Sequence, residues 1–167
     1  MDGLILIDKQ VGATSYDAVR LVKRIFNTNK VGHCGTLDPF ASGLLIIGIN
    51  QATKVMTFLE HDYKEYEAVI KLGSFTDTYD LTGKVIESKE VTSFNEEKLQ
   101  EVLSSFLGEI TQVPPIYSSI HIDGKKLYEY ARENIKVDVP ERKVNIYDIK
   151  LLDYTSDTIK IYVKCSR

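Results

Sequence analysis

Hydrophobic and polar positions follow two different periods along this chain. Between residues 14 and 26, apolar side chains recur at intervals of three and four, which places them on one face of a helix. Thr14 and Ser15 offer an N-cap, Asp17 places an acid in the first turn, and Arg20 and Lys23 fall on the opposite face. The pattern predicts an amphipathic helix that begins near Thr14 and ends near Asn27.

Residues 64–72 have the period of a strand instead. Tyr66, Ala68 and Ile70 fall on one face, and the charged residues Glu65 and Glu67 fall on the other. Apolar or alternating runs predict further strands at residues 4–8, 44–49, 84–88, 144–152 and 158–165.

Cap signals and periodicity predict further helices. Ser93 and Glu96 match a capping box that precedes an apolar stripe, and Gly108 is expected to close that helix. Shorter helices are expected at residues 52–59 and 126–132, and an acidic loop at residues 73–83. Because several strands follow one another without an intervening helix, we expect an α+β fold with a mixed, largely antiparallel sheet flanked by helices.

Composition favours one globular domain of 167 residues, with 43% apolar and 27% charged residues. No apolar run reaches bilayer length, and the N-terminus has no signal-peptide pattern. Cys34 and Cys165 cannot form a disulfide framework, so we expect free thiols, a cytoplasmic location and no membrane partner. The net charge is -3, but residues 61–110 alone carry a net charge of -6, which leaves a basic face from the two ends of the chain possible.

The segment at residues 32–39 places His33, Cys34 and Asp38 between two glycines and a proline, which predicts a loop from His33 to Asp38. Because loops often carry binding and catalytic groups, this segment is the first candidate for chemistry. The carboxylate of Asp38 is suited to act as a nucleophile, a base or a metal ligand. A turn in which Asp38 only caps backbone is an equal alternative. No zinc-ligand spacing surrounds His33 and Cys34, and a reactive thiol is not favoured, so we expect no metal there.

Three further candidates have two interpretations each. Asp77 and Asp80 suit either a magnesium ion or an Asx-rich turn. Tyr66 suits either stacking on a flat base or packing in the core, and its pattern alone favours the core. A basic group suits either phosphate contacts or a solvated surface, and comprises Lys125, Lys126, Arg132, Arg142 and Lys143.

Four blocks of this sequence stand in a distinctive order. They are Asp8-Lys9-Gln10-Val11-Gly12-Ala13-Thr14-Ser15, the segment from Lys30 through Gly32-His33-Cys34-Gly35-Thr36-Leu37-Asp38-Pro39 to Leu45, the segment from Lys64-Glu65-Tyr66-Glu67-Ala68 to Thr76-Asp77-Thr78-Tyr79-Asp80-Leu81-Thr82-Gly83, and the segment from Gln112-Val113-Pro114-Pro115 to Arg132. Together they resemble the bacterial tRNA pseudouridine synthase B (TruB) family, to which dyskerin is more distantly related. The match spans almost the whole chain, and the second block is highly specific.

The resemblance implies a pseudouridine synthase-like fold and an isomerase without a cofactor, which converts uridine 55 in the T loop of tRNA to pseudouridine. It implies that Asp38 is catalytic and that Tyr66 stacks on the uracil, which must be flipped out of the RNA. It assigns His33 to the displaced loop nucleotides, Asp80 to organising a basic partner of the catalytic carboxylate, and Lys9 to substrate binding. The family leaves the chemical route of the aspartate open.

The sequence departs from the family pattern at three places. Gln10 replaces a usual proline, His121 replaces a usual lysine, and the chain ends where the family continues into Gly-Thr-Tyr-Ile-Arg. We therefore expect residues 1–167 to be the N-terminal part of a catalytic domain, without its C-terminal part or the RNA-binding domain, and to be weakly active or inactive alone.

The expected partner is the T-arm of tRNA, bound by a monomer. Two other functions remain open. One is a non-catalytic tRNA-binding or tRNA-folding module of the same lineage. The other, which the sparse ligand pattern disfavours, is a metal-assisted hydrolase that uses Asp38, Asp77 and Asp80.

Overall fold

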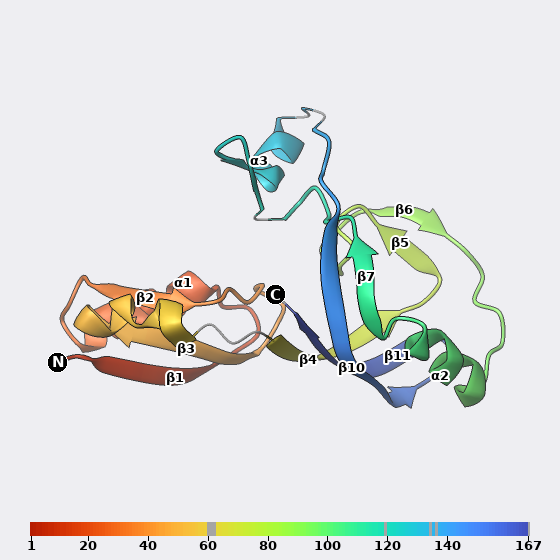
Figure 1. Ribbon diagram of the computed structural model, residues 1–167, viewed down its shortest axis with the longest axis horizontal. Helices are drawn as coiled ribbons and strands as arrows, with labels where there is room; N and C mark the ends of the chain where they lie inside the picture. Colours follow the sequence, from red (N-terminus) through yellow and green to blue (C-terminus); the bar gives the residue numbers. More distant parts are fainter. Residues whose placement is uncertain (60–62, 119, 134, 136, 167) are drawn as a thin grey trace. The chain divides into compact units, whose positions relative to one another are not determined.

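The chain divides into two compact units, Met1–His61 and Asp62–Arg167. The computed structural model describes residues 1–59, 63–118, 120–133, 135 and 137–166, and the side chains of residues 128 and 132 lie outside that description. All strand pairs are antiparallel within the described residues, which confirms the expected α+β class. Figure 1 shows the helices and strands of each unit.

The first unit is a small sheet covered by one helix. Its elements are β1 (Gly3–Lys9), α1 (Ser15–Ile25), β2 (Val31–Cys34), β3 (Gly43–Ile49) and the 3₁₀ turns η1 (Asn50–Lys54) and η2 (Met56–Leu59). The strand order is β1-β3-β2. The apolar stripe of α1 packs on β3, and the buried residues of this core are Ala18, Val19, Val22, Leu45, Ile47 and Ile49.

Helix α1 forms as its sequence pattern predicts. Thr14 is the N-cap and accepts from the backbone N–H of Asp17, while the Asp17 carboxylate accepts from the Thr14 backbone N–H at 2.8 Å. Hydrogen bonds from Thr14 and Arg20 hold the pKa of the Asp17 carboxyl well below its usual range. This reciprocal capping box fixes the start of the helix next to the loop that follows β2.

The second unit is built on a four-stranded sheet of order β4-β11-β10-β7. Its elements are β4 (Tyr63–Lys71), β5 (Ser74–Thr76), β6 (Val85–Ser88), α2 (Glu96–Ser104), β7 (Gly108–Gln112), β8 (His121–Ile122), β9 (Lys125–Lys126), α3 (Leu127–Arg132), β10 (Arg142–Tyr154) and β11 (Thr158–Ser166). Leu99 of α2 is buried with Ile159 and Ile161 of β11.

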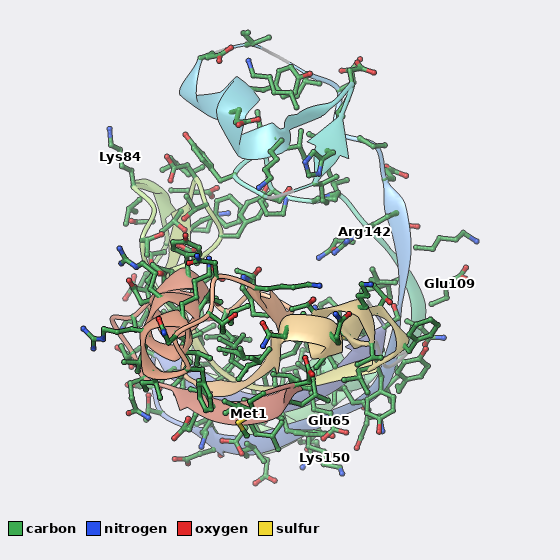
Figure 2. All side chains as sticks on the ribbon, turned by 90° about the vertical axis from the view of Figure 1, so that its left-hand side faces the viewer. Met1, Glu65, Lys84, Glu109, Arg142 and Lys150 are labelled. Carbon is green, nitrogen blue, oxygen red and sulfur yellow. The ribbon has the colours of Figure 1, made fainter. Side chains whose placement is uncertain are left out.

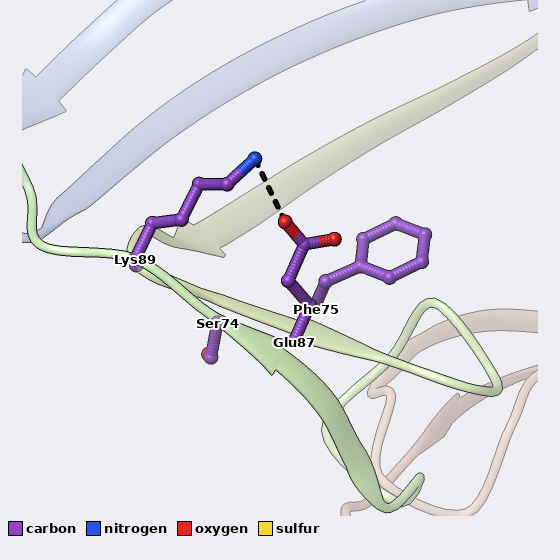
Figure 3. A pocket seen from close by; sticks show the side chains of 5 residues that line it. Ser74, Phe75, Glu87 and Lys89 are labelled. Atoms are coloured by element: carbon purple, nitrogen blue, oxygen red, sulfur yellow. Dashed lines mark ion pairs between the residues drawn. The ribbon is translucent and has the colours of Figure 1, made fainter.

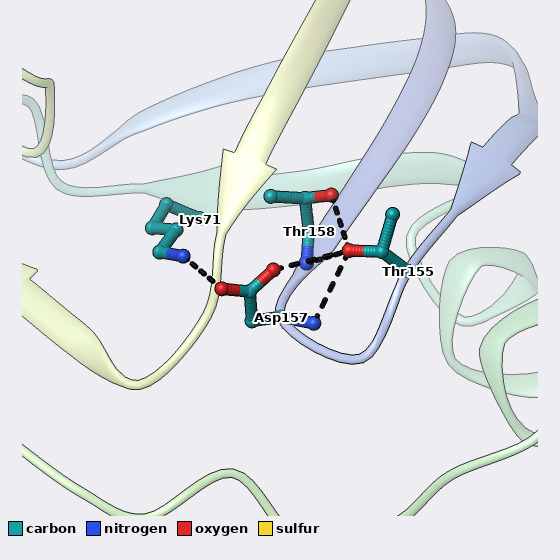
Figure 4. Close-up of polar contacts among 4 residues, drawn as sticks. All are labelled: Lys71, Thr155, Asp157 and Thr158. Atoms are coloured by element: carbon teal, nitrogen blue, oxygen red, sulfur yellow. Dashed lines mark hydrogen bonds and ion pairs between the residues drawn. The ribbon is translucent and has the colours of Figure 1, made fainter.

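The turn between β10 and β11 also holds the edge strand β4 in register. Thr155 and Thr158 bond each other through their hydroxyls at 2.7 Å, and Asp157 forms an ion pair with Lys71 of β4 (Figure 4). The Leu72 backbone N–H donates to the Asp157 carbonyl at 2.8 Å. Because Lys71 and Thr158 are register partners, these contacts align the whole of β4 along β11.

The structure corrects several expected elements. The short helix expected at residues 52–59 is found as two 3₁₀ helices, over residues 50–54 and 56–59, in which the hydroxyls of Thr53 and Thr57 donate to carbonyls three residues earlier. Helix α2 is capped by Asn95, not Ser93, and ends at Ser104. Gly108 does not close that helix but begins strand β7, with φ of 91°.

Two further corrections affect candidate residues. The segment predicted as a loop from His33 begins in a strand, because His33 and Cys34 are the last residues of β2 and pair with Ile47 and Ile46 of β3. The predicted acidic loop contains β5, which forms a hairpin with β6. The strands predicted at residues 4–8, 44–49, 64–72, 84–88, 144–152 and 158–165 are confirmed within one or two residues.

Candidate functional site

The loop at residues 35–42, hereafter the anchored loop, carries Asp38 and is held at several points along its backbone. Ser15, which is 3% exposed, donates from its hydroxyl to the Leu37 carbonyl at 3.2 Å and accepts from the Leu37 N–H at 3.0 Å. The Gly12 N–H donates to the Pro39 carbonyl at 2.7 Å. An Ala41 N–H to Asp38 carbonyl bond of 3.0 Å closes a turn inside the loop.

Lys9 supplies the strongest of these anchors. Its side chain is 2% exposed, and Nζ donates to the carbonyls of Gln10, Ala13 and Ala41 at 3.2, 2.8 and 2.6 Å. The three donors of one ammonium therefore join the end of β1, the segment before α1 and the anchored loop. Substrate binding by Lys9 stays a prediction, and these hydrogen bonds are those of a residue that holds the loop.

The Asp38 side chain is left available by this arrangement. The residue is exposed, and among the described residues no hydrogen bond or ion pair engages its carboxylate. Its backbone is fixed by its neighbours, so the carboxylate is presented to solvent from a rigid support. The alternative in which Asp38 serves only as a turn cap predicts a bonded carboxylate, and the described contacts do not favour it.

His33 lies half-buried at the end of β2, on the side of the sheet that carries Ile47. Its Nδ1 bonds the carbonyl of Gly35, the first residue of the anchored loop. A carbonyl only accepts, so Nδ1 carries the proton and Nε2 is left as an acceptor. Cys34 contacts the Met56 carbonyl at 4.0 Å, and both cysteines are free thiols.

Tyr66 and Asp80 belong to the second unit. Tyr66 lies on β4 opposite Val163 and is 41% exposed. It shares a face with Ala68, which pairs with the buried Ile161, but Tyr66 is not among the residues of that core. The interpretation of Tyr66 as a plain core residue is therefore not supported.

Asp80 is held inside the turn at residues 76–83, hereafter the acidic turn. Its Oδ1 accepts from the Thr78 hydroxyl at 2.7 Å, the Thr82 N–H at 2.8 Å and the Thr82 hydroxyl at 2.6 Å. Burial raises the pKa of Asp80, but the hydrogen bonds from Thr82 and Thr78 outweigh it and leave the pKa below its usual value. Asp77 accepts from the Lys84 N–H at 2.8 Å, so both acids bond their own turn, as in an Asx-rich turn.

Position 83 of this turn has no room for a side chain, so only glycine is accommodated there. A Cβ on Gly83 would overlap the Thr78 hydroxyl, and would lie 2.6 Å from Asp77 Oδ1 and 2.9 Å from the Thr78 nitrogen. This close approach lets the turn fold tightly around Asp80. Within the described residues, no group of three or more His, Cys, Asp or Glu side chains is placed to hold a metal ion.

Two of the five residues in the predicted basic group are paired with acids. Lys125 pairs with Glu133 at 2.5 Å, and Lys143 pairs with Glu109 at 2.6 Å. Arg142 Nε donates to Gln112 Oε1 at 2.8 Å across β10 and β7, where Figure 2 labels Arg142 and Glu109. The Arg132 side chain lies outside the described residues. Phosphate binding by this group stays a prediction.

A shallow hollow lies on the β5–β6 hairpin of the second unit. It has a volume of about 270 Å³ and is lined by Gly73, Ser74, Phe75, Glu87 and Lys89, with Lys89 and Glu87 paired at 2.7 Å (Figure 3). It contains none of the candidate residues. No helix among the described residues has the length and apolar character needed to span a membrane.

The structure thus groups Lys9, His33 and Asp38 on or around the anchored loop in the first unit, and places Tyr66 and Asp80 on separate elements of the second. Sequence reasoning missed the role of Ser15, which it used only as part of a helix cap. The signal was its position on the buried face of α1, among apolar residues.

Comparisons with known proteins agree with these observations. Residues 23–167 match the family described as "TruB family pseudouridylate synthase (N terminal domain)". The chain is 47% identical over 167 residues to tRNA pseudouridine synthase B of Clostridium acetobutylicum, covering 100% of this chain and 57% of that protein. It is 45% identical to the protein of that name from Endomicrobium trichonymphae, covering 99% of this chain and 72% of that protein.

Two solved structures also match almost the whole of this chain. A Cbf5–Nop10–Gar1 complex contains a chain that matches with a TM-score of 0.72 and 29% identity, over 98% of this chain and 39% of that one. A structure of an H/ACA RNP bound to a substrate RNA containing 2'-deoxyuridine matches with a TM-score of 0.67 and 27% identity, over 98% of this chain and 38% of that one.

These matches place the chain, with its α+β fold, in the class of proteins described as pseudouridylate synthases of the TruB type, over the N-terminal domain of that class. The chain belongs to the TruB family, as the four sequence blocks predict. It spans 57% of the length of the Clostridium acetobutylicum relative.

Proposed function

We propose that the protein isomerises uridine 55 in the T loop of tRNA to pseudouridine. The N1–C1′ glycosidic bond breaks, the uracil rotates, and a C5–C1′ bond forms as the C5 proton is released and N1 takes up a proton. Atoms and electrons balance without a co-reactant, so the reaction needs no cofactor. The names of the relatives support tRNA as the substrate.

One observation carries the proposal: a carboxylate that is exposed, and unpaired among the described residues, stands on a loop whose backbone is tied down by Lys9, Ser15 and Gly12. Positioned groups lower a barrier because the orientation is arranged before the substrate arrives. In our proposal Asp38 is the catalytic residue, and Lys9 acts by holding its loop.

The other roles follow the family resemblance. Tyr66 stacks on the flipped uracil, for which its partly exposed ring is suited. His33 contacts the displaced loop nucleotides and has Nε2 free to accept, since Nδ1 is engaged. Asp80 organises a basic partner of the catalytic carboxylate through Oδ2, because Oδ1 is occupied by the acidic turn.

We further propose that residues 1–167 correspond to the N-terminal part of the catalytic domain, that the T-arm is the bound portion of tRNA, and that the protein acts as a monomer in the cytoplasm. The family match to an N-terminal domain supports the first point. Two free cysteines support a reducing compartment.

The test is tritium release from a T-arm stem-loop RNA labelled at uracil C5, with protein in excess over RNA. Two proteins are compared: the 167-residue chain, and a chimaera in which residues 1–167 precede the remaining C-terminal part of the Clostridium acetobutylicum relative. We expect release by the chimaera and little or none by the chain alone. Asp38→Asn should abolish release in the chimaera and leave RNA binding largely intact.

Asp148→Asn is the matched control, because it makes the same chemical change at a carboxylate that pairs with Lys150 on β10. We expect it to keep full activity. Release that survives Asp38→Asn refutes the catalytic assignment. A chimaera that binds RNA without any release supports the non-catalytic tRNA-binding alternative instead.

A further inference from the structure

The outer face of α1 carries an exposed aromatic ring between cations. Tyr16 is 57% exposed, with the Arg20 guanidinium 5.6 Å and the Lys23 ammonium 6.0 Å from its ring centroid. Arg24 follows on the last turn of the helix. We call these four residues the α1 face.

Positive charge is concentrated on the α1 face, although the chain as a whole has a negative net charge. The chain has a net charge of -3, yet three of the six Lys and Arg residues among residues 1–60 lie on α1. One acid, Asp17, pairs with Arg20, so Lys23 and Arg24 provide the excess positive charge. A cationic surface with a stacked aromatic ring is the chemistry that binds nucleic-acid backbone and unpaired bases.

The position of the face ties it to the anchored loop within the same unit. Ser15, the residue before Tyr16, bonds both backbone groups of Leu37, which precedes Asp38. The first turn of α1 therefore lies beside the loop that carries Asp38, within reach of the nucleotides that flank one bound there. From Tyr16 to Lys23 the helix rises about 10 Å, enough for roughly three phosphates along one strand.

We propose that the α1 face binds the sugar–phosphate backbone of the RNA beside the nucleotide presented to Asp38, with Lys23 and Arg24 on phosphates and the Tyr16 ring against a base or sugar. This inference rests on the proposed function, because it takes the occupant to be the substrate RNA. An acidic protein segment is the competing occupant, and the test separates the two.

The experiment measures binding of a fluorescein-labelled T-arm stem-loop RNA to the 167-residue chain by fluorescence anisotropy, at several KCl concentrations. Because the Lys23→Ala/Arg24→Ala variant lacks two cations for phosphates, its salt slope should be smaller by about 1.5 and its affinity lower by roughly 10- to 40-fold at 0.1 M salt. Tyr16→Ala should weaken binding at least about fivefold, and Tyr16→Phe should keep it. All variants should keep the far-UV circular dichroism of the parent, because the altered side chains are on the outer face.

The matched control is Lys89→Ala/Lys98→Ala, which removes two exposed lysines that pair with Glu87 and Glu101 in the second unit. It should change affinity by less than about twofold and leave the salt slope unchanged. Lys23→Arg, which keeps the charge, should bind as the parent does.

The outcomes separate this inference from the proposed function. If the parent chain binds the RNA and the α1 variants bind equally well, the inference is overturned and the proposed function stands. If the parent chain does not bind the RNA, the inference is overturned, and the proposed function is still decided by tritium release in the chimaera. Polyglutamate represents the competing occupant, an acidic protein segment. If polyglutamate displaces the RNA at an equal concentration of charge, the proposal that RNA occupies the α1 face is overturned.

Discussion

Replacing Lys9 with methionine tests how the anchored loop is held. The two side chains have similar volume, so Lys9→Met keeps the packing on the buried side of β1 and removes only the ammonium. Three carbonyls, those of Gln10, Ala13 and Ala41, are then left without this donor. The last of them belongs to the anchored loop and lies 32 residues from Lys9 in sequence.

The magnitude follows from two opposing contributions. Each hydrogen bond to a charged group stabilises the fold by about 1.5–3 kcal/mol. Burying an ammonium at 2% exposure costs several kcal/mol, which offsets much of that gain. We expect a net loss of about 3 kcal/mol in the free energy of unfolding of the first unit, equivalent to roughly 100-fold in the opening equilibrium.

Hydrogen exchange of individual amides measures this without assuming that both units unfold together. The reporters are the backbone amides of Ile47 and Ile49, at the core of β3 and nearly inaccessible to solvent. Under conditions in which exchange follows the opening equilibrium, their rates should rise roughly 100-fold in Lys9→Met. Amides of β10 and β11 in the second unit provide an internal reference.

Lys30→Met is the matched control, because Lys30 is an exposed lysine in the same unit. A surface change of this kind is expected to alter stability by no more than about 0.5 kcal/mol. Exchange at Ile47 and Ile49 that stays within about twofold of the parent in Lys9→Met would refute the reasoning that the ammonium holds this unit together.

Three further predictions concern the acidic turn and the anchored loop. Gly83→Ala should destabilise the second unit by about 1–3 kcal/mol in urea titration, because its Cβ overlaps the Thr78 hydroxyl, and an unchanged midpoint would contradict this. Thr82→Val should raise the pKa of Asp80 in a carbon-13 NMR titration, with Thr82→Ser as the control that keeps the hydroxyl. Since the folded pKa of Asp80 is depressed, its contribution to stability is present above the unfolded value near ~3.9 and is lost as pH falls through the folded value. In Thr82→Val that loss should be smaller and should end at a higher pH, and an unshifted titration would disprove the role of the hydroxyl. Ser15→Ala should cost about 1–3 kcal/mol in exchange of the amides of the anchored loop, since two buried backbone groups lose a partner, whereas protection equal to the parent's would show that the bonds are dispensable.

Elements with a strong local signal could be predicted from the sequence alone. Helix α1 has a complete capping box and a regular apolar stripe, so its start and its buried face were both predicted correctly. Strands β10 and β11 were predicted correctly because alternation over many residues specifies one face. The four sequence blocks were sufficient to identify the family.

Elements that depend on distant partners could not be predicted. Strand β7 lacks a strand-like pattern of its own and forms because residues 108–112 pair with β10, more than thirty positions away. His33 was expected in a loop because glycines surround it, yet pairing with β3 draws it into β2. Ser93 matched a cap motif, but Asn95 lies where the first turn of α2 begins.

For the candidate site, the sequence by itself determined which chemical groups are available: a carboxylate at Asp38, an imidazole at His33, a phenol at Tyr66. Only the tertiary structure decided how the first of these is presented. The hydroxyl of Ser15 and the ammonium of Lys9 reach the anchored loop from 22 and 32 residues away along the chain. Periodicity and spacing describe neighbours along the chain, whereas hydrogen bonds over such separations form only when β1, α1 and β3 have packed into one unit.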